Sequence, residues 1–469
     1  MNSSFRFFCN FSALICFITC LFFLSGTYLI ICTVPFFYLF FVFLTNTLHG
    51  LWRNRPLTAY ILTILLWIRM VMLPFYGTVS GAYYSHTAAP ELKQFLLNSV
   101  FLCIYDSFAI FFLLLIVSTK IKTTKRSLIT NGLYGQKEVY VVFCLFALFV
   151  FVTIGRHMHL YDFIIKPVGN GLEREGDITD SRALMIREIV GSGISFLFLL
   201  IVYSLHKKYN QTLSNKYFIL SLLCALLLIS IISGERRTSQ LYKGFASVYL
   251  LLSLYPHKSR KTTSTVGIFA FVIIALMTVY KQFNAFMYDT YSEAMQNASL
   301  DKGFSYKNID SYFYGIDTIA KNLYYGQKMD VGFSQFFYDF FRNFFGINFF
   351  IHGGGLLTTQ MYNVAIYSGD QLTGLLLTSV GYGYLFGGYV LAPFATIINV
   401  IIMLFFEKCL RNSKTIEWQY VFAIVYIRFA FGVLSATPPL INLITRILFI
   451  NGSVILFARM IKNWIIKYE

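Results

Sequence analysis

The stretch FSQFFYDFFRNFF, residues 333–345, decides how the chain is divided, because it lies inside a long segment, 281–371, that contains no fully apolar span. Its phenylalanines recur at intervals of three and four residues, and polar side chains fill the other face: Ser334, Gln335, Asp339, Arg342 and Asn343. This period predicts an amphipathic helix that lies on a bilayer surface. The aromatic content of the segment argues against disorder, and an ordered connection of this length usually serves a function.

The composition places the chain in a membrane. Of its 469 residues, 57% are hydrophobic, 19% aromatic and 13% charged, and the mean hydropathy is +0.64. Such a chain cannot cover itself with a polar surface and must bury its apolar residues in lipid. The first apolar run, Phe5 to Gly26, lacks a small-residue cleavage pattern, so we predict a transmembrane helix there rather than a signal peptide.

The charge distribution predicts the topology. The net charge is +17, but the basic residues gather in short breaks between apolar runs, in every second loop. This is the positive-inside pattern, which argues against nucleic-acid binding and predicts that both termini are cytoplasmic. The clusters are Arg53 and Arg55; Lys120, Lys122, Lys125 and Arg126; Lys207, Lys208 and Lys216; Lys258, Arg260 and Lys261; Lys408, Arg411 and Lys414; and Arg459, Lys462 and Lys467.

The predicted fold is an all-α polytopic membrane protein with about twelve transmembrane helices and one large extracytoplasmic loop that contains interfacial helices. We divide it into 1–280 with nine spans, the outer loop 281–371, and 372–469 with three spans. The run 373–406 is too long for one span, so a bent or re-entrant piece is expected around Gly381–Gly388. The predicted spans are 5–25, 28–49, 57–77, 96–117, 139–155, 189–205, 217–233, 241–256, 264–281, 373–406, 418–435 and 441–461.

Several chemistries lack their motifs. The sequence has no Gly-x4-Gly-Lys-Ser/Thr loop, no cytoplasmic Asp-x-Asp and no Gly-x-Ser-x-Gly elbow. The eight cysteines fall in apolar runs or at predicted cytoplasmic helix ends, with no spacing typical of a metal site. We therefore expect neither a metal nor another cofactor, and either a reaction on the outer face or a transport path.

Arginines at predicted outer helix ends are the main candidates for binding an anionic substrate. Arg236 and Arg237 follow Ser233-Gly-Glu235, and two guanidiniums on such a turn can hold a diphosphate by bidentate hydrogen bonds. Arginines at the lipid interface, neutralised by Glu235 and lipid headgroups, explain the same residues. Arg156 is a candidate second phosphate contact, with an interfacial structural role as the alternative.

Two further residues are candidates. His352 precedes three glycines, which let the backbone approach a ligand, and a histidine there can deprotonate a sugar hydroxyl. A histidine that only packs in the loop is an equal alternative. Arg428 lies in an apolar run, where it can bind phosphate in a central cavity or form an internal ion pair with Asp106, and we favour the pair.

The chain resembles the bacterial polymerases of O-antigen and capsule repeat units (Wzy-type). The resemblance rests on the helix number, the arginine break at 233–237, the single dominant outer loop, Gly353-Gly-Gly-Leu-Leu-Thr-Thr-Gln360, and Gly381-Tyr-Gly-Tyr-Leu-Phe-Gly-Gly388. It implies a metal-independent glycosyltransferase in the bacterial inner membrane, with Arg236 or Arg237 on the diphosphate leaving group. His352 is similar in placement to the loop histidine of the related O-antigen ligases.

The implied substrate is an undecaprenyl-diphosphate-linked oligosaccharide, whose glycan is transferred on the periplasmic face to a second repeat unit. Membrane lipids and a chain-length regulator protein are the other expected partners. Two alternatives stay open. An O-antigen ligase differs only in its acceptor, the lipid A core, whereas a flippase or other transporter predicts charges along the membrane interior of many helices.

Overall fold

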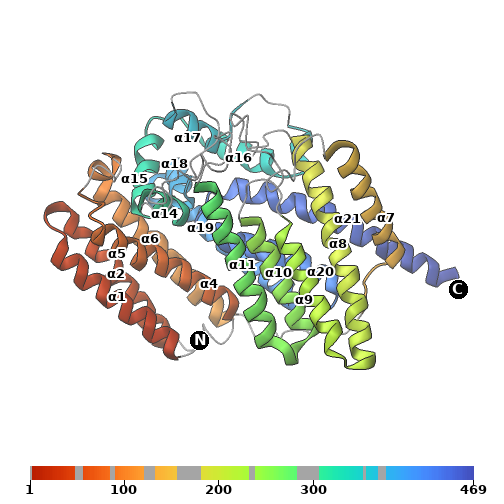
Figure 1. Cartoon of the computed structure of the whole chain (residues 1–469). Coiled ribbons are helices and arrows are strands. Elements are labelled where there is room, and N and C mark those ends of the chain that lie inside the picture. The colour runs from red at the N-terminus through yellow and green to blue at the C-terminus, as the bar shows by residue number, and fades with distance from the viewer. Residues whose placement is uncertain are drawn as a thin grey trace, which may run out of the picture. The chain divides into compact units, whose positions relative to one another are not determined.

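The computed structural model describes residues 3–47, 56–84, 90–120, 132–155, 181–231, 238–282, 306–351, 355–367 and 377–468. Within these ranges every regular element is a helix, apart from one isolated bridge between Thr378 and Ser435 (Figure 1). The predicted all-α class is thereby confirmed. The chain divides into two compact units. Unit 1 comprises Met1–Thr124, Phe304–Glu407 and Phe429–Asn442, and unit 2 comprises Lys125–Gly303, Lys408–Arg428 and Leu443–Glu469.

Unit 1 contains the N-terminal helices and most of the segment predicted to form the outer loop. Its elements are α1 (Ser3–Phe23), η1 (Gly26–Cys32), α2 (Thr33–Thr47), α4 (Pro56–Trp67), the π-helix η2 (Ile68–Met72), α5 (Leu73–Val79), α6 (Pro90–Lys120), α14 (Tyr306–Phe313), α15 (Ile316–Gly326), α16 (Phe333–Asn343), η6 (Ile347–Phe349), α17 (Thr358–Ile366), α18 (Ser379–Leu391) and the first part of α19 (Phe394–Asn412).

Unit 2 is a bundle built from the middle and the end of the chain. Its elements are α7 (Lys137–Val150), the π-helix η3 (Phe151–Gly155), α8 (Ser181–Thr212), α9 (Asn215–Ser230), α10 (Thr238–Leu254), η4 (Pro256–Lys258), α11 (Ser259–Gln282), most of α20 (Ile416–Gly432) and the larger part of α21 (Thr437–Tyr468). Sequential helices α7, α8, α9, α10 and α11 pack against one another, as short connections favour.

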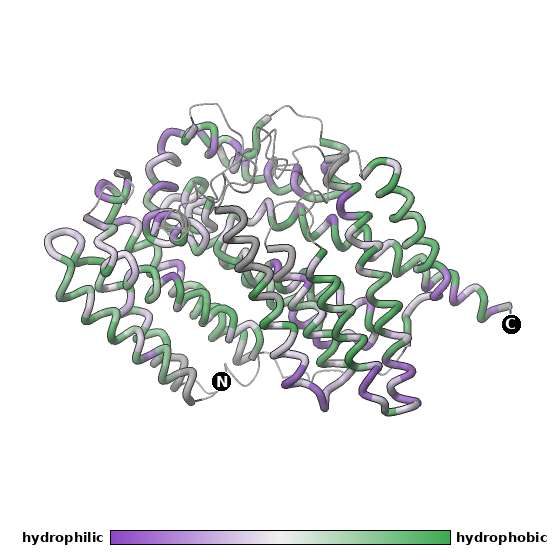
Figure 2. Tube along the Cα trace, in the orientation of Figure 1, coloured by the Kyte–Doolittle hydropathy of each residue, from purple (hydrophilic) through white to green (hydrophobic). Residues whose placement is uncertain are grey.

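The described helices include candidate membrane spans. Five are long and apolar enough to cross a bilayer, and the bent pair α18 and α19 makes a sixth if it counts as one span. Shorter apolar helices occupy Phe7–Phe23, Gly26–Val42 and Asn215–Ser230. Figure 2 shows apolar residues along most of α7 and α8, with hydrophilic residues near helix ends. A membrane-embedded chain is thus supported, and twelve spans stay a prediction. The five are Leu57–Val79, Glu91–Val117, Lys137–Ile154, Met185–Thr212 and Thr437–Lys467.

The expected bend around Gly381–Gly388 is present. Helices α18 and α19 meet at 114°, and Gly387 and Gly388 depart from helical geometry, with φ of +57° at Gly388. Glycine adopts this left-handed region without the steric cost that a side chain adds. The hydroxyl of Tyr105 in α6 donates to the carbonyl of Val390, 3.3 Å away, which satisfies one backbone group near the break.

Helices α14 and α15 form a hairpin, in which α15 packs along α6 and α14 packs against α5 and η2 (Figure 1). At its turn, the carbonyl of Tyr314 and the carboxylate of Asp106 share the guanidinium of Arg69. At the C-terminal end of α15, the Tyr325 hydroxyl donates to Glu91 over 3.0 Å. Asp106 lies near the middle of its candidate span and Glu91 at its end, so α15 covers half of that span. Part of the predicted outer loop therefore packs among the spans.

The ion pair at this turn is fully buried. Arg69 Nη1 lies 2.6 Å from Asp106 Oδ2, and both side chains have no exposed surface. Arg69 Nε donates to the Tyr314 carbonyl over 2.9 Å, where Tyr314 itself has a left-handed φ of 55°. The guanidinium thus holds a strained turn in place. This corrects the predicted pair of Asp106 with Arg428, because the carboxylate is bound by Arg69.

The Asp310 side chain links the two helices of the hairpin. Its Oδ2 accepts hydrogen bonds from both the amide and the hydroxyl of Thr318, each over 2.7 Å. The N-cap of α15 is Gly315, which has no side chain to accept from the helix amides, so Asp310 of the preceding helix supplies the acceptor. A Cβ on Gly315 would lie 1.9 Å from the Asp310 carboxylate, which excludes any larger residue there.

The amphipathic helix predicted from the phenylalanine pattern is confirmed as α16, and its polar side faces the protein. Asp339 and Asn343 are buried, whereas Phe333, Phe337 and Phe341 are 59%, 50% and 42% exposed. Hydrogen bonds with neighbouring elements compensate the burial of the polar side, as described below. An outward phenylalanine face without hydrogen-bonding groups suits a lipid interface.

We predict that removing one partner of the Arg69–Asp106 pair destabilises unit 1 strongly. Arg69→Met leaves Asp106 buried without a counter-charge, a change that typically costs about 3–5 kcal/mol. The double variant Arg69→Met with Asp106→Leu should lose less, because no buried charge remains unpaired. Thermal unfolding of the purified protein in detergent measures both. A double variant less stable than either single variant would contradict this account.

Candidate functional site

Three cations and one carboxylate of unit 2 are linked by an ion pair and by electrostatic interactions through Lys243. Arg446 of α21 binds Glu188 of α8, with Nη2 and Oε1 3.2 Å apart. Lys243 of α10 is close enough to Glu188 and to Arg428 of α20 for both charges to act on it. We call Lys243, Arg428, Arg446 and Glu188 the cationic cluster. Among the described residues, the cluster contains three cationic side chains and one carboxylate, a composition that suits an anionic ligand.

Each cation is positioned by a neighbouring group. The Lys243 ammonium donates to the carbonyl of Ile231, 2.7 Å away, just after the end of α9. A cation at a helix C-terminus is favoured by the partial negative charge of the last carbonyls. The Arg428 guanidinium lies 4.6 Å from the centroid of the Tyr242 ring, a cation–π geometry that orients its plane. Adjacent residues of α10 thus supply one cation, Lys243, and the ring that orients a second, Arg428.

The cluster can bind a phosphate or diphosphate. Guanidinium groups present pairs of N–H donors that match phosphate oxygens, and Lys243 adds a point charge. The residues come from the ends of α8, α10, α20 and α21 that the positive-inside pattern predicts to be outer. The ion pair with Glu188 orients the guanidinium of Arg446.

The structure describes only one of the five predicted site residues. Arg428 belongs to the cationic cluster, whereas Arg156, Arg236, Arg237 and His352 lie outside the described residues. Lys243 and Arg446 were not predicted from the sequence. Both stand inside long helices, where a charged residue is itself a signal, and a search for such residues near predicted outer ends would have found them.

A second polar constellation, in unit 1, surrounds Asp339 of α16. Its Oδ1 accepts from the Gln335 side chain and from the Thr358 amide, each over 3.0 Å, and its Oδ2 accepts from the Tyr382 hydroxyl over 3.0 Å. The N-cap of α17 is Leu357, which has no acceptor, so Asp339 takes that role from another helix. One buried carboxylate therefore joins α16, α17 and α18.

Other side chains of α16 fix the described residues on either side of 352–354. Arg342 donates to the carbonyl of Asn348 over 3.1 Å. Tyr338 donates to Gly355 and Gln335 to Leu356, each over 2.9 Å. The helix predicted from the phenylalanines therefore also binds the described residues that flank positions 352–354.

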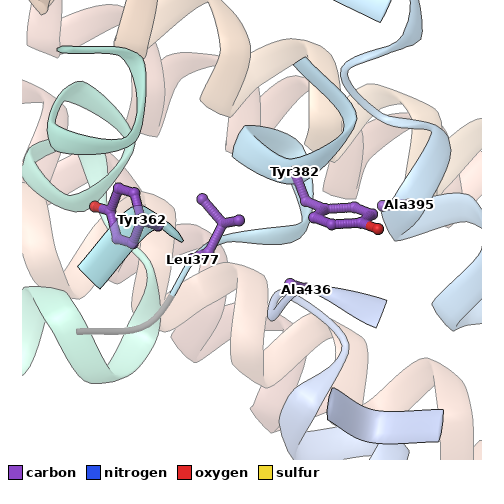
Figure 3. Close-up of a cluster of buried hydrophobic side chains, with 5 residues drawn as sticks. All are labelled: Tyr362, Leu377, Tyr382, Ala395 and Ala436. Carbon is purple, nitrogen blue, oxygen red and sulfur yellow. The ribbon is translucent and has the colours of Figure 1, made fainter. Parts of the chain in front are cut away.

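A small apolar core lies beneath this constellation. Figure 3 shows Leu377 between the rings of Tyr362 and Tyr382, with Ala395 and Ala436 beside Tyr382. The segment is held by backbone bonds from Ser379 to Leu434, 2.8 Å, and from Ala436 to Leu377, 3.0 Å. This pairing fixes the start of α18, and with it the orientation of Tyr382 toward Asp339.

No protein-family model, curated protein or solved structure matches the chain. Within the described ranges, no group of three or more histidine, cysteine, aspartate or glutamate residues could hold a metal ion. Functional assignment therefore depends on the residues and their geometry.

We predict that Asp339 contributes a specific pH dependence. Burial raises the pKa of Asp339 above its ordinary value of 3.8, although its hydrogen bonds act in the opposite direction. A raised pKa means that the folded protein favours the protonated carboxyl, so this contribution to stability is present below pH 3.8 and is lost as pH rises through the folded-state pKa. As the pH rises from 4 to 7, the melting temperature of Asp339→Asn should fall less than that of the unmodified protein, because the amide does not ionise.

The matched control is Asp330→Asn, which changes an exposed aspartate just before α16. Its melting temperature should follow the same pH profile as the unmodified protein in detergent. Equal profiles for Asp339→Asn and Asp330→Asn would contradict a special contribution from the buried carboxylate.

Proposed function

We propose that the chain is a metal-independent membrane glycosyltransferase that polymerises oligosaccharide repeat units carried on undecaprenyl diphosphate. The observation that supports this most directly is the cationic cluster, a set of three cationic side chains at helix ends predicted to be outer. Such a site suits the diphosphate of a lipid-linked donor. In this proposal the reaction takes place on the periplasmic face of a bacterial inner membrane.

The proposed reaction needs no added energy source. The acceptor hydroxyl oxygen attacks the anomeric carbon of the donor, and the bond from that carbon to the diphosphate oxygen breaks. The electron pair leaves with the diphosphate, whose developing charge is stabilised by Arg428, Lys243 and Arg446. Arg156, Arg236 and Arg237 are the further proposed contacts to the diphosphate. The hydroxyl proton passes to His352, the proposed base.

A transport function has one observation in its favour. Around the hairpin of α14 and α15, unit 1 buries five charged side chains among its helices, a feature that a flippase predicts. Each of them has a structural partner, however, because they form the Arg69–Asp106 pair, the Asp317–Lys321 pair, 3.1 Å apart, and the cap made by Asp310. The hairpin of α14 and α15 explains these charges without a translocation path.

Deletion of the gene and analysis of the surface glycan by gel would separate the candidate functions. Loss of a polymerase leaves a single repeat on the lipid core, loss of a ligase leaves none, and loss of a flippase accumulates lipid-linked repeats on the inner leaflet. We expect the single repeat. A full-length ladder in the deletion strain would contradict the proposed function.

Complementation with variants tests the cationic cluster. Arg428→Met and Arg446→Met should each reduce polymer formation about 100-fold at normal protein level, since each removes a group that stabilises the leaving charge. Arg260→Met, which changes an exposed arginine in the first turn of α11, is the control and should complement fully. Full-length ladders from Arg428→Met, and from Arg236→Ala and Arg237→Ala, would refute the diphosphate assignment.

A further inference from the structure

A second aromatic surface in unit 1 differs in chemistry from the phenylalanine face of α16. Tyr324 and Tyr325 end α15, and their rings meet edge to face, with centroids 4.9 Å apart and an interplanar angle of 88°. Phe95 of α6 supports Tyr324 from below, 6.3 Å away at 70°. Both tyrosines are half-buried, so their positions are fixed while part of each side chain stays accessible.

Two charged groups border these rings. The Tyr325 hydroxyl donates to Glu91 Oε1 over 3.0 Å, and burial together with this carboxylate raises the pKa of Tyr325 to about 12. The ammonium of Lys328, an exposed residue, lies 4.1 Å from the centroid of Tyr324 and 5.2 Å from that of Tyr325. One acidic and one basic side chain thus contact the aromatic pair.

The Glu91 carboxylate has an unused acceptor. Its Oε2 is buried and has no hydrogen-bond partner among the residues that the structure describes. Glu91 also stands in the first turn of α6, where a negative charge is favoured, but that effect requires no bond to Oε2. A buried acceptor without a donor is costly, and a hydroxyl donor from a ligand would remove this cost.

This combination matches a saccharide better than a lipid or a phosphate. A sugar ring presents a C–H face that packs on an aromatic ring, and hydroxyls that bind a carboxylate and an ammonium. The phenylalanine face of α16 has no such polar groups and suits acyl chains. The charges of Glu91 and Lys328 cancel, so the site has no excess charge to attract an anion.

We infer that Glu91, Tyr324, Tyr325 and Lys328 form a binding site for an uncharged sugar unit. The inference rests on the proposed function, in which this site takes the glycan of the acceptor. Lys328 covers the face of Tyr324 in the absence of sugar; its flexible side chain moves aside and donates to a sugar hydroxyl, while Glu91 accepts from another.

The test uses the full-length protein in detergent and the single repeat oligosaccharide cut from the surface polysaccharide of the producing strain. Saturation-transfer NMR should detect binding to the unmodified protein. Glu91→Gln, Tyr324→Leu and Lys328→Ala should each weaken it at least about 10-fold. Tyr312→Leu is the matched control, because it removes a tyrosine of α14 that is 55% exposed and is not part of the proposed site, and it should bind normally.

Lys328→Ala keeps the test informative if the other variants fold poorly, because it changes only an exposed side chain. Normal binding by Lys328→Ala and Glu91→Gln, or no binding by the unmodified protein, would overturn the inference. If the deletion strain loses polymer but the protein binds no repeat, the site is wrong and the proposed function stands. If the deletion strain keeps its polymer while the protein binds the repeat, the function is wrong and the site stands.

Discussion

A charge buried between apolar helices must find a partner there, and in unit 1 this requirement organises the packing. Arg69 and Asp106 come from two candidate spans and neutralise each other 2.6 Å apart. The Nε of the same guanidinium donates to the turn between α14 and α15. A polar hairpin is thereby tolerated among the spans, and its second helix carries the two tyrosines to the Glu91 end of α6.

The helices of the spans could be predicted from the sequence because each depends on a local apolar run. The bend between α18 and α19 was also predictable, since it follows from glycines and from a run too long for one span. The packing of α14 and α15 was not. Asp310, Asp317 and Lys321 are typical of a solvated loop, and only the three-dimensional structure shows that each is compensated by a residue on the same hairpin.

The candidate site likewise contains one feature that was predictable from a local pattern and others that were not. Arg428 attracted attention because a charge in an apolar run is costly, but its neighbours could not be inferred. Lys243 and Arg446 approach Glu188 from separate helices, and no local pattern connects positions so far apart in the chain. Helix capping shows this as well. Asp310 and Asp339 each satisfy the start of a later helix, where the residue at the cap position, Gly315 or Leu357, offers no acceptor.

The break between α18 and α19 has a consequence for how such a chain can diverge. A helix interrupted among apolar neighbours leaves backbone carbonyls that water cannot reach, and here the Tyr105 hydroxyl serves the carbonyl of Val390. The glycines that permit the bend and the hydroxyl that makes it tolerable lie on different helices. In homologous sequences, loss of Tyr105 should therefore coincide with a straighter α18 or with a new hydroxyl on a neighbouring turn. The residue at position 105 and the glycines of the bend should thus vary together.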